Sequence, residues 1–517
     1  MAKVGLAAGS QIAAAAGAAI ANQGGNAVDA ALAAALVSMS TDLGVMAPGA
    51  GGFITLWPPA GDPVVIDAYA EVPGRGLKPG HMGQGAFEVT FDYGGPMSNV
   101  VGYGAVATPG IFAGLGVASE RYGLLPWRRV IDPAIRWVEE GFPLTGGAAE
   151  YLRYTHEAIF SWHPDSYRTL HHADGSLLQA GERVRIPELG ASLRQIAEAG
   201  WEAFYTGDIG QRMAAEVQNN GGLLTAADLA AYRAICRSPL ELQVGEWTVI
   251  TNPAPAIGGA CLGAMLLLLD HRYQGQDSQA ALQTLIEVQR AVLDYRTHSL
   301  NHAMPNDAAV ATLLDLAKGG NTRGLMQSPS TIHVSAVDDR GWACSITASA
   351  GYGSGAMVSG TGLWLNNSLG EVDLHPQGID GLSPGTRLSS NMAPTIARHA
   401  DGTTLAIGSP GASRITTAIA QVLHHFIHDN MDLASSIAAP RLHVEVAAHD
   451  GLRLAFEPGL SMSALDKSVL VDFALYPFAD VSMYFGGVQA SLWHPQLGII
   501  SVADSRRAGG AAQGGDA

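Results

Sequence analysis

The stretch that decides the fold reads TIHVSAVDDRG and covers residues 331–341. Apolar and polar residues alternate from Thr331 to Asp338, which is the period of a half-buried β-strand. Residues 339–341 have the composition of a tight turn, and residues 342–348 return as a second strand. The preceding segment, KGGNTRG at 318–324, has no hydrophobic period. We therefore expect a flexible linker that leads into a β-hairpin near residue 330.

The chain differs on the two sides of this hairpin. Before it the pattern is mostly helical, with two alanine-rich helices over 11–38 that are separated at Gly24-Gly25 and capped at Asn26, a short strand at 51–56, and helical periodicity in 109–140 and 191–235. After it, strand patterns recur at 362–366, 395–398, 403–408, 487–492 and 498–503, with helices expected at 416–429 and 461–467. The last ten residues, AGGAAQGGDA, have the composition of a disordered tail. The C-terminal third is therefore expected to be strand-rich, with helices that cover its sheets.

Composition and charge exclude several classes of protein. The chain has 517 residues, of which 47% are hydrophobic, so it can bury a large core. Its net charge of −17 and its lack of a Lys/Arg run argue against nucleic acid as a partner. Ser10 and Gln11 interrupt the early alanine run, so we expect no secretory signal and a cytoplasmic location, with secretion left open. The apolar run at 262–269 is too short to span a membrane, and no membrane association is expected.

Familiar metal, disulfide and nucleotide motifs are missing from the sequence. Cys236, Cys261 and Cys344 lie far apart, without the C-x-x-C spacing of a zinc or disulfide framework. His424 and His428 are one helical turn apart, but no glutamate lies between them and no third ligand is evident. The sequence contains neither a phosphate-binding loop nor a G-x-S-x-G motif. We therefore expect no metal and no cofactor.

Thr331 could act as a nucleophile if the bond between Ser330 and Thr331 were cut. A hydroxyl and a free α-amine would then share one residue, and an α-amine titrates near ~7.7 to 8, where it can serve as a base. The same hydroxyl could make the cut by attacking the Ser330 carbonyl, which gives an ester that water opens. From these residues alone, an ordinary strand start after a linker remains the alternative.

Motifs along most of the chain add to this hypothesis. Thr331 to Asp338 with Gly341 fits the signature T-x-H-x-S-x-V-D-x-x-G. Further motifs follow in order: GGNAVDAA at 24–31, TPG at 108–110, FYTG at 204–207, NGGLLT at 220–225, DLAAY at 228–232, LNN at 365–367, LSS at 388–390, GSPGASR at 408–414 and APR at 439–441. In these motifs and their order the chain resembles the γ-glutamyltransferases, a family of N-terminal-nucleophile hydrolases.

The resemblance implies a fold and an assembly. The fold is α+β, a four-layer αββα sandwich. Self-cleavage would give a large, mostly helical subunit of residues 1–330 and a small subunit of residues 331–517. The two would remain packed as one domain, a heterodimer of the chain's own fragments, and further dimerisation is left open.

The resemblance also assigns roles residue by residue. Thr331 is the expected nucleophile for both self-cleavage and turnover, and Ser349 supplies the hydroxyl that bonds its amine. Backbone N–H groups of Gly411 and Ala412 would form the oxyanion hole, provided that the φ angle of Ala412 allows it. Ser389 and Ser390 would bind the carboxylate of the acyl donor, while His333 and Ser335 are expected to serve sheet packing.

The expected substrate pocket departs from the family pattern. The family has an arginine just before a Glu-x-x-Pro stretch, and residues 67–73, DAYAEVP, contain none. Arg75 is the candidate substitute, and Asn367 and Glu371 complete the predicted substrate-binding set. Other family positions are changed as well: Gly360 and Ser368 stand where an acidic residue and a glutamine are expected, and the loop after Ser349 is shorter.

Three functions remain open from the sequence. The first is an acyl-Thr331 enzyme that passes the acyl group of a small carboxylated donor to water or an amine, with specificity altered from γ-glutamyl. The second is hydrolysis of a carbon–carbon bond beside a keto acid, as is thought for relatives in antibiotic biosynthesis. The third is an inactive, zymogen-like binding protein.

Overall fold

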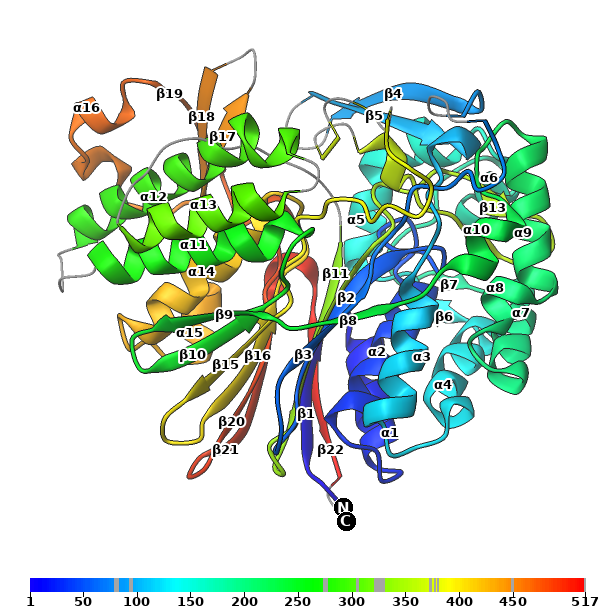
Figure 1. Ribbon diagram of the computed structural model, residues 1–517, viewed down its shortest axis with the longest axis horizontal. Helices are drawn as coiled ribbons and strands as arrows, with labels where there is room; N and C mark the ends of the chain where they lie inside the picture. The colour runs from blue at the N-terminus through cyan, green and yellow to red at the C-terminus, as the bar shows by residue number, and fades with distance from the viewer. Residues whose placement is uncertain are drawn as a thin grey trace.

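Two antiparallel sheets form the centre of the computed structural model (Figure 1). The structure describes residues 1–78, 83–92, 96–272, 278–303, 306–319, 331–371, 374–375, 378, 381–447 and 451–515. The first sheet has the order β22-β1-β11-β12-β2-β3-β8. Its strands are β1 (Val4–Ala8), β2 (Gly51–Trp57), β3 (Val64–Ala68), β8 (Ile235–Arg237), β11 (Ile332–Asp338), β12 (Ala343–Ser349) and β22 (Gly510–Gly514).

The second sheet lies against the first and has the order β21-β20-β16-β15-β10-β9. Its strands are β9 (Leu240–Val244), β10 (Trp247–Thr251), β15 (Thr395–His399), β16 (Thr404–Gly408), β20 (Gln489–His494) and β21 (Gly498–Ala503). β11 of the first sheet packs on β16 and β20 of the second. Side chains of β11 therefore alternate between this interface and the helices behind the first sheet.

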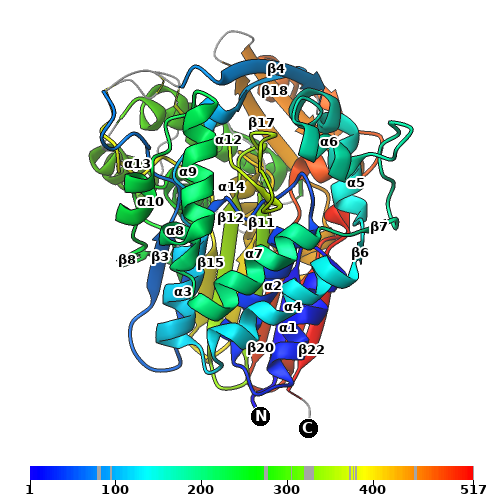
Figure 2. The ribbon, with the colours of Figure 1, turned by 90° about the vertical axis from the view of Figure 1, so that its right-hand side faces the viewer.

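Helices cover the outer face of each sheet. On the first sheet, in front of it in Figure 2, pack α1 (Gln11–Ala21), α2 (Ala27–Thr41) and α3 (Ile111–Tyr122). Outside them, α4 (Trp127–Glu140) packs on α2, and α7 (Pro187–Ala199) packs on α4. The other layer lies beside the second sheet: α11 (Ile257–Arg272), α12 (Ser278–His298), α13 (Asp307–Lys318) and α14 (Arg414–Ile427). The expected αββα sandwich is confirmed.

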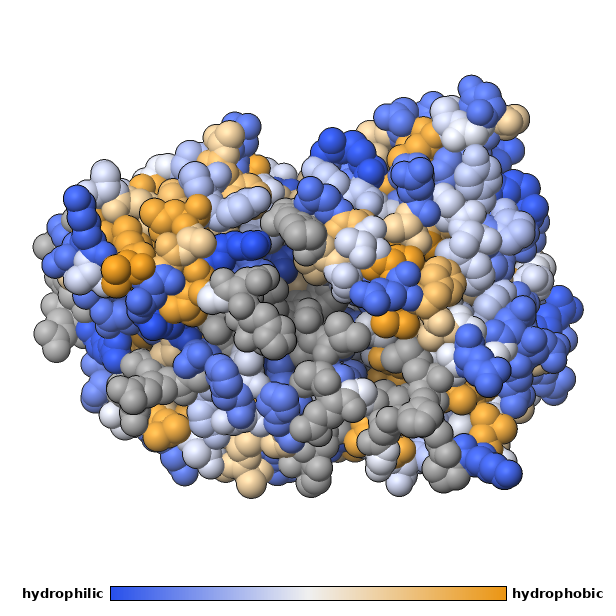
Figure 3. Space-filling model, turned by 90° about the horizontal axis from the view of Figure 1, so that it is seen from above, coloured by the Kyte–Doolittle hydropathy of each residue, from blue (hydrophilic) through white to orange (hydrophobic). Residues whose placement is uncertain are grey.

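Smaller elements surround this core. The further strands are β4 (Ala86–Asp92), β5 (Pro96–Gly102), β6 (Phe142–Pro143), β7 (Arg183–Val184), β13 (Met357–Val358), β14 (Leu363–Trp364), β17 (Leu442–Ala447), β18 (Gly451–Phe456) and β19 (Phe473–Pro477). The further α-helices are α5 (Gly146–Thr155), α6 (Pro164–Leu170), α8 (Ala203–Thr206), α9 (Asp208–Asn219), α10 (Ala226–Ala231), α15 (Leu433–Ala438) and α16 (Lys467–Leu470). On the upper face, apolar side chains gather in small groups separated by polar ones (Figure 3), as on an ordinary globular surface.

The alanine-rich N-terminal segment packs as the sequence predicts. Asn26 caps α2, because its side chain accepts from the Asp29 N–H while the Asp29 carboxylate accepts from the Asn26 N–H. Small residues let α1 and α2 approach closely, since a Cβ at Gly17 would lie 2.7 Å from the carbonyl oxygen of Ala30. Every residue of α2 is buried, so this helix belongs to the core.

Two sequence expectations are wrong. Half of the supposedly disordered tail is strand β22 (Gly510–Gly514), which pairs with β1 from Val4↔Gly514 to Ala8↔Gly510. Its glycines are needed for packing, because a Cβ at Gly514 would lie 2.3 Å from the Ala18 carbonyl oxygen. In place of the helix expected at 461–467, the structure has a 3₁₀ turn at Met462–Ala464 and then a separate short helix, α16. Asp466 caps α16, because its side chain accepts from the Ser468 N–H.

The remaining expectations for the fold concern the linker and the membrane. Residues 320–330, with most of the expected linker and Ser330, lie outside the described residues. In the described part of the chain, no helix is both long enough and apolar enough to cross a bilayer.

Candidate active site

Thr331 lies immediately before β11 and is 1% exposed. His333 and Ser335 share its face of the strand, because side chains two residues apart point the same way. The Ser335 hydroxyl donates to the Gln489 carbonyl of the second sheet at 3.0 Å. Thr331 is therefore on the strand face that looks toward the second sheet.

His333 serves the packing between the sheets, as expected. Its Nδ1 lies 2.8 Å from Thr347 Oγ1, and its Nε2 lies 2.8 Å from Ser335 Oγ. Burial lowers the pKa of His333 to about 3, so the ring is neutral at physiological pH. A Cβ at Gly408 would lie 2.2 Å from the ring, so a glycine at this position of β16 makes room for the histidine.

A row of four residues crosses the first sheet at the level of Thr331. β11 and β12 pair with Ile332 opposite Ala348, and one further step in this register places Thr331 opposite Ser349. Ser349 is paired with Gly51 on β2, and continuing the pairing of Gly52 with Ala68 places Tyr69 opposite Gly51. Directly opposed residues of antiparallel strands point to the same face. We call Thr331, Ser349, Gly51 and Tyr69 the nucleophile row.

Ser349 and Asn367, both predicted site residues, are held by the loops next to this row. The Gly351 N–H donates to Ser349 Oγ at 3.0 Å. Asn367 Oδ1 accepts from the Gly353 N–H at 3.1 Å, and its Nδ2 donates to Asn99 Oδ1 at 2.8 Å. Asn367 therefore joins the 350–353 loop to β5.

Gly411 and Ala412 occupy the turn that precedes α14. Gly411 has φ 125° and Ala412 has φ 68°, so the backbone is left-handed at a residue that carries a Cβ. A non-glycine residue in this region costs about 1–2 kcal/mol, and such strain is often found at functional sites. The turn lies close to Gly486, because a Cβ at Gly411 would be 2.8 Å from the Gly486 Cα.

A small cavity of about 30 Å³ lies beside Thr331. Its lining is Gly9, Asp42, Val45, Thr145, Gly147, Ala148, Thr331, Ile332, His333, Pro410, Met483 and Arg507. Because Pro410 directly precedes Gly411 and lines this cavity, the turn before α14 lies beside Thr331. Asp42 accepts from the Thr145 hydroxyl at 3.4 Å, and burial raises the pKa of the Asp42 carboxyl to about 6. Asp42 and Arg507 belong to no motif that the sequence singled out, and sequence reasoning missed both.

Tyr69, at the far end of the row, meets two predicted substrate-binding residues. Its hydroxyl donates to Glu371 Oε2 at 3.1 Å, and Ser390 and Ser368 hydroxyls lie beside it. Burial and the Glu371 carboxylate raise the pKa of Tyr69 well above its ordinary value. Its ring stacks on Phe53, with 5.7 Å between ring centroids.

Arg387 fixes the backbone around Tyr69 and was not predicted. The Leu388 N–H donates to the Ala70 carbonyl at 3.0 Å, and Glu71 forms a bridge with Arg387, so the Ser389–Ser390 segment runs antiparallel beside Tyr69. The Arg387 guanidinium donates to the Tyr69 carbonyl at 2.6 Å. It also pairs with Asp67 at 3.6 Å and Glu71 at 3.7 Å.

Arg75, the candidate carboxylate ligand, is paired with protein acids. Its guanidinium lies 3.4 Å from Asp228 and 3.6 Å from Glu71. The Asp228 carboxylate also accepts from the Arg75 backbone N–H at 2.9 Å. The structure thus places Arg75 among carboxylates. The nucleophile row and its loops connect Thr331 and Ser349 with Glu371 and Ser390.

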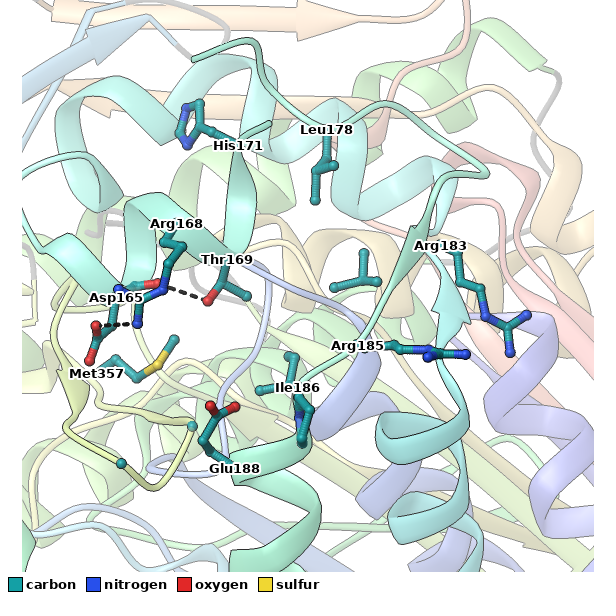
Figure 4. A pocket seen from close by; sticks show the side chains of 14 residues that line it. Asp165, Arg168, Thr169, His171, Leu178, Arg183, Arg185, Ile186, Glu188 and Met357 are labelled. Carbon is teal, nitrogen blue, oxygen red and sulfur yellow. Dashed lines mark hydrogen bonds and ion pairs between the residues drawn. The ribbon is translucent and has the colours of Figure 1, made fainter. Parts of the chain in front are cut away.

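A larger cavity of about 450 Å³ lies between residues 165–188 of the N-terminal half and the β13–β14 hairpin (Figure 4). None of the described residues that line it is a predicted site residue. Its arginines already have protein partners, since Arg168 pairs with Asp165 at 2.6 Å and Arg183 and Arg185 both donate to the Glu140 carbonyl at the end of α4. Arg183 and Arg185 therefore supply hydrogen bonds to a carbonyl at the C-terminus of α4 that has no partner within the helix.

Comparisons with known proteins agree with the motifs. The family model described as gamma-glutamyltranspeptidase matches residues 13–514. The glutathione hydrolase proenzyme of Escherichia coli strain K12 is 29% identical over 82% of this chain and 78% of its own. The Acylase ACY 1 proenzyme of Pseudomonas sp. strain V22 is 30% identical over 84% of this chain and 81% of its own. The crystal structure of a cephalosporin acylase from Bacillus halodurans shares the fold, with a TM-score of 0.77, 22% identity, and 99% and 96% of the two chains covered.

Proposed function

Because the chain belongs to the gamma-glutamyltranspeptidase family of enzymes, we propose that Thr331 is freed by self-cleavage and then carries an acyl group as an ester. The observation that carries this proposal is the place of Thr331. Thr331 is buried immediately before β11, and the register of β11 and β12 places it opposite Ser349. It lines a cavity that Pro410 also lines.

Self-cleavage would use the Thr331 hydroxyl against the preceding peptide bond. Oγ1 attacks the Ser330 carbonyl carbon and loses its proton, the C–N bond breaks, and the nitrogen takes up that proton and leaves as the α-amine of Thr331. Water then opens the ester, which leaves a carboxylate on Ser330 and restores the hydroxyl. The products are a 1–330 fragment and a 331–517 fragment.

Turnover repeats this chemistry on a bound donor. The α-amine takes the hydroxyl proton as Oγ1 attacks the donor carbonyl, and Ser349 holds the amine. The N–H groups of Gly411 and Ala412 stabilise the oxyanion, as a fixed pair of backbone donors can. The proton passes to the leaving amine, and water or a second amine then takes the acyl group from Thr331.

The names of two relatives point to amide donors of more than one kind. Both are at about 30% identity over most of the chain, and they are named a glutathione hydrolase and an acylase. We therefore place hydrolysis of an amide donor first, with the donor's identity set by the residues around Tyr69. The expectation of a carboxylated donor remains a prediction, and carbon–carbon bond hydrolysis remains an outcome that a donor screen would reveal.

A denaturing gel with intact-mass measurement tests the cut. The wild-type chain should give two fragments, the second beginning at Thr331, and Thr331→Ala should stay full length and inactive. An active preparation that is a single uncut chain would refute the proposal. Turnover of γ-glutamyl, glutaryl and oxalyl compounds then compares the donor classes.

A further inference from the structure

We infer that Asp42 carries the proton during self-cleavage. Through one water molecule, its carboxylate takes the proton of the Thr331 hydroxyl and returns it to the nitrogen that leaves. The inference rests on the proposed role of Thr331 and concerns the rate of the cut and its control. It makes the protonation state of Asp42 the switch for cutting.

Asp42 lies at the end of α2, where the backbone holds it on both sides. Its N–H donates to the Ser38 carbonyl, and its carbonyl accepts from the Met46 N–H at 3.0 Å. The residue is 5% exposed, and every residue of α2 before it is buried. The carboxylate therefore has little freedom to turn away from the interior.

The carboxylate reaches the face of the first sheet on which Thr331 lies. β11 runs between β1 and β12, and Ser349 flanks Thr331 on the β12 side. On the β1 side, one further step in the pairing with β11 places Gly9 opposite His333. A Cβ at Gly9 would lie on the face that His333 and Thr331 share, and it would be 3.7 Å from Asp42 Oδ2. Asp42 and Ser349 thus flank the nucleophile from opposite sides.

The cavity of about 30 Å³ connects this carboxylate to the nucleophile, because Asp42, Thr145 and Thr331 all line it. A water molecule needs at least about 10–15 Å³ of such volume and two to four polar partners, so the cavity has room for a water between these side chains. As Oγ1 attacks the Ser330 carbonyl carbon, its proton passes to this water, which gives a proton to Asp42. When the C–N bond breaks, Asp42 returns the proton through the same water to the nitrogen, so no proton is gained or lost.

Asp42 is the group at this cavity whose charge changes near neutral pH. Of the described residues that line it, His333 and Arg507 are the others that can carry charge. Burial lowers the pKa of His333 to about 3, and Arg507 stays positive throughout. Burial raises the pKa of Asp42 to about 6, while neighbouring hydroxyl groups moderate the rise. A carboxylate with a pKa near the working pH is a stronger base than an ordinary one and is still ionised at pH 7.

The buried carboxylate is costly to the fold. Burial disfavours its ionised form, and an asparagine would accept from the Thr145 hydroxyl at the same place without that cost. An acid that is kept at such a cost beside a nucleophile is typical of a functional site.

The rate of self-cleavage as a function of pH tests the inference on the full chain. The chain is labelled briefly during cell-free synthesis and diluted into buffers between pH 5 and 8, and loss of the full-length band is followed on a denaturing gel. The wild-type rate constant should rise about tenfold from pH 5 to pH 7 and be nearly flat above, because only the ionised carboxylate takes the proton. A rate constant that is the same at pH 5 and pH 7 overturns the inference.

Asp42→Asn separates proton transfer from structure. It should lower the rate constant at pH 7.5 by about 100-fold or more and remove the rise between pH 5 and 7. The same change in uncut Thr331→Ala should leave unfolding in urea cooperative, so that slow cutting is not a result of misfolding. Asp165→Asn, which removes a carboxylate from the larger cavity, is the matched control and should cut at the wild-type rate. Asp42→Asn that cuts as fast as the wild type, or that cuts slowly with the wild-type pH profile, overturns the inference.

The two proposals fail in different ways. If the wild-type chain is cut before Thr331 and the cut is independent of Asp42, the role of Asp42 is wrong while the nucleophile stands. If the wild-type chain is active but uncut at every pH, or if Thr331→Ala is still cut, the proposed function itself is wrong and the inference falls with it.

Discussion

Asp42 lines the cavity beside the proposed nucleophile and titrates in an accessible range. Burial raises its pKa from 3.8 to about 6, so the folded state holds a proton that the unfolded chain releases between these values. Stability is therefore unaffected by this group below about pH 4, falls as the pH rises toward 6, and stays lowered above it. Asp42→Asn should remove this loss, on the order of 3 kcal/mol, at pH 7.

Urea unfolding of uncut Thr331→Ala, with and without Asp42→Asn, measures the effect at pH 4, 5, 6 and 7. The uncut background keeps unfolding a single-chain reaction. The gap between the two proteins should open between pH 4 and 6. A gap that is constant across this range would mean that Asp42 does not titrate in the folded protein.

Ala412 carries the backbone strain of the proposed oxyanion turn. Its φ of 68° disfavours a Cβ, so Ala412→Gly should stabilise the uncut protein by about 1 kcal/mol in urea unfolding. Ala420→Gly, the same change within α14, should instead destabilise by about 1 kcal/mol or more. Destabilisation by both changes would show that the turn at Ala412 is unstrained.

The sequence predicts some site residues and misses others for a physical reason. Thr331 and Ser349 lie within or next to a strong hairpin pattern, and the hairpin brings them together without help from the rest of the chain. Tyr69 joins them only through the order of strands in the sheet, which a single sequence does not show. Asp42 and Arg507 meet at Thr331 from segments more than 400 residues apart and carry no local pattern.

At the scale of elements, β22 shows why composition misled. The segment has few large apolar residues, because the strand passes under α1, where larger side chains do not fit. The limits of strands with a clear pattern, such as β11 and β12, are predicted within a residue or two. Their side chains alternate in character because one face packs on helices and the other on the second sheet. Low hydrophobicity marks disorder only where no close packing demands small residues.

Close packing of β22 on α1 makes a sharp prediction. Gly514→Ala would place its Cβ 2.3 Å from the Ala18 carbonyl oxygen and should cost about 1–3 kcal/mol of stability, measured by urea unfolding of the uncut protein. Gly146→Ala is the matched control, because its nearest contact would be 3.8 Å away. Equal stability of the two variants would show that β22 can leave α1 without cost.

At the scale of the whole molecule, cleavage before Thr331 would divide the sequence without dividing the fold. In the first sheet β1 and β2 come from residues before the cut, while β22, β11 and β12 come from residues after it. In this sheet the two fragments therefore meet at three antiparallel junctions, β22 with β1, β1 with β11, and β12 with β2, and in the second sheet they meet where β10 pairs with β15. One hydrophobic core, with residues such as Leu36 and Val334, draws on both fragments.

These junctions predict that the cut protein behaves as one particle. After cleavage, both fragments should co-elute in gel filtration at the position of uncut Thr331→Ala, because separating them would expose the strand edges at every one of these junctions and a shared core. They should part only at denaturant concentrations that also unfold the uncut chain. Elution of a folded 331–517 fragment by itself in plain buffer would contradict this, because that fragment would then have to keep β11 and β12 without the strands on either side of them.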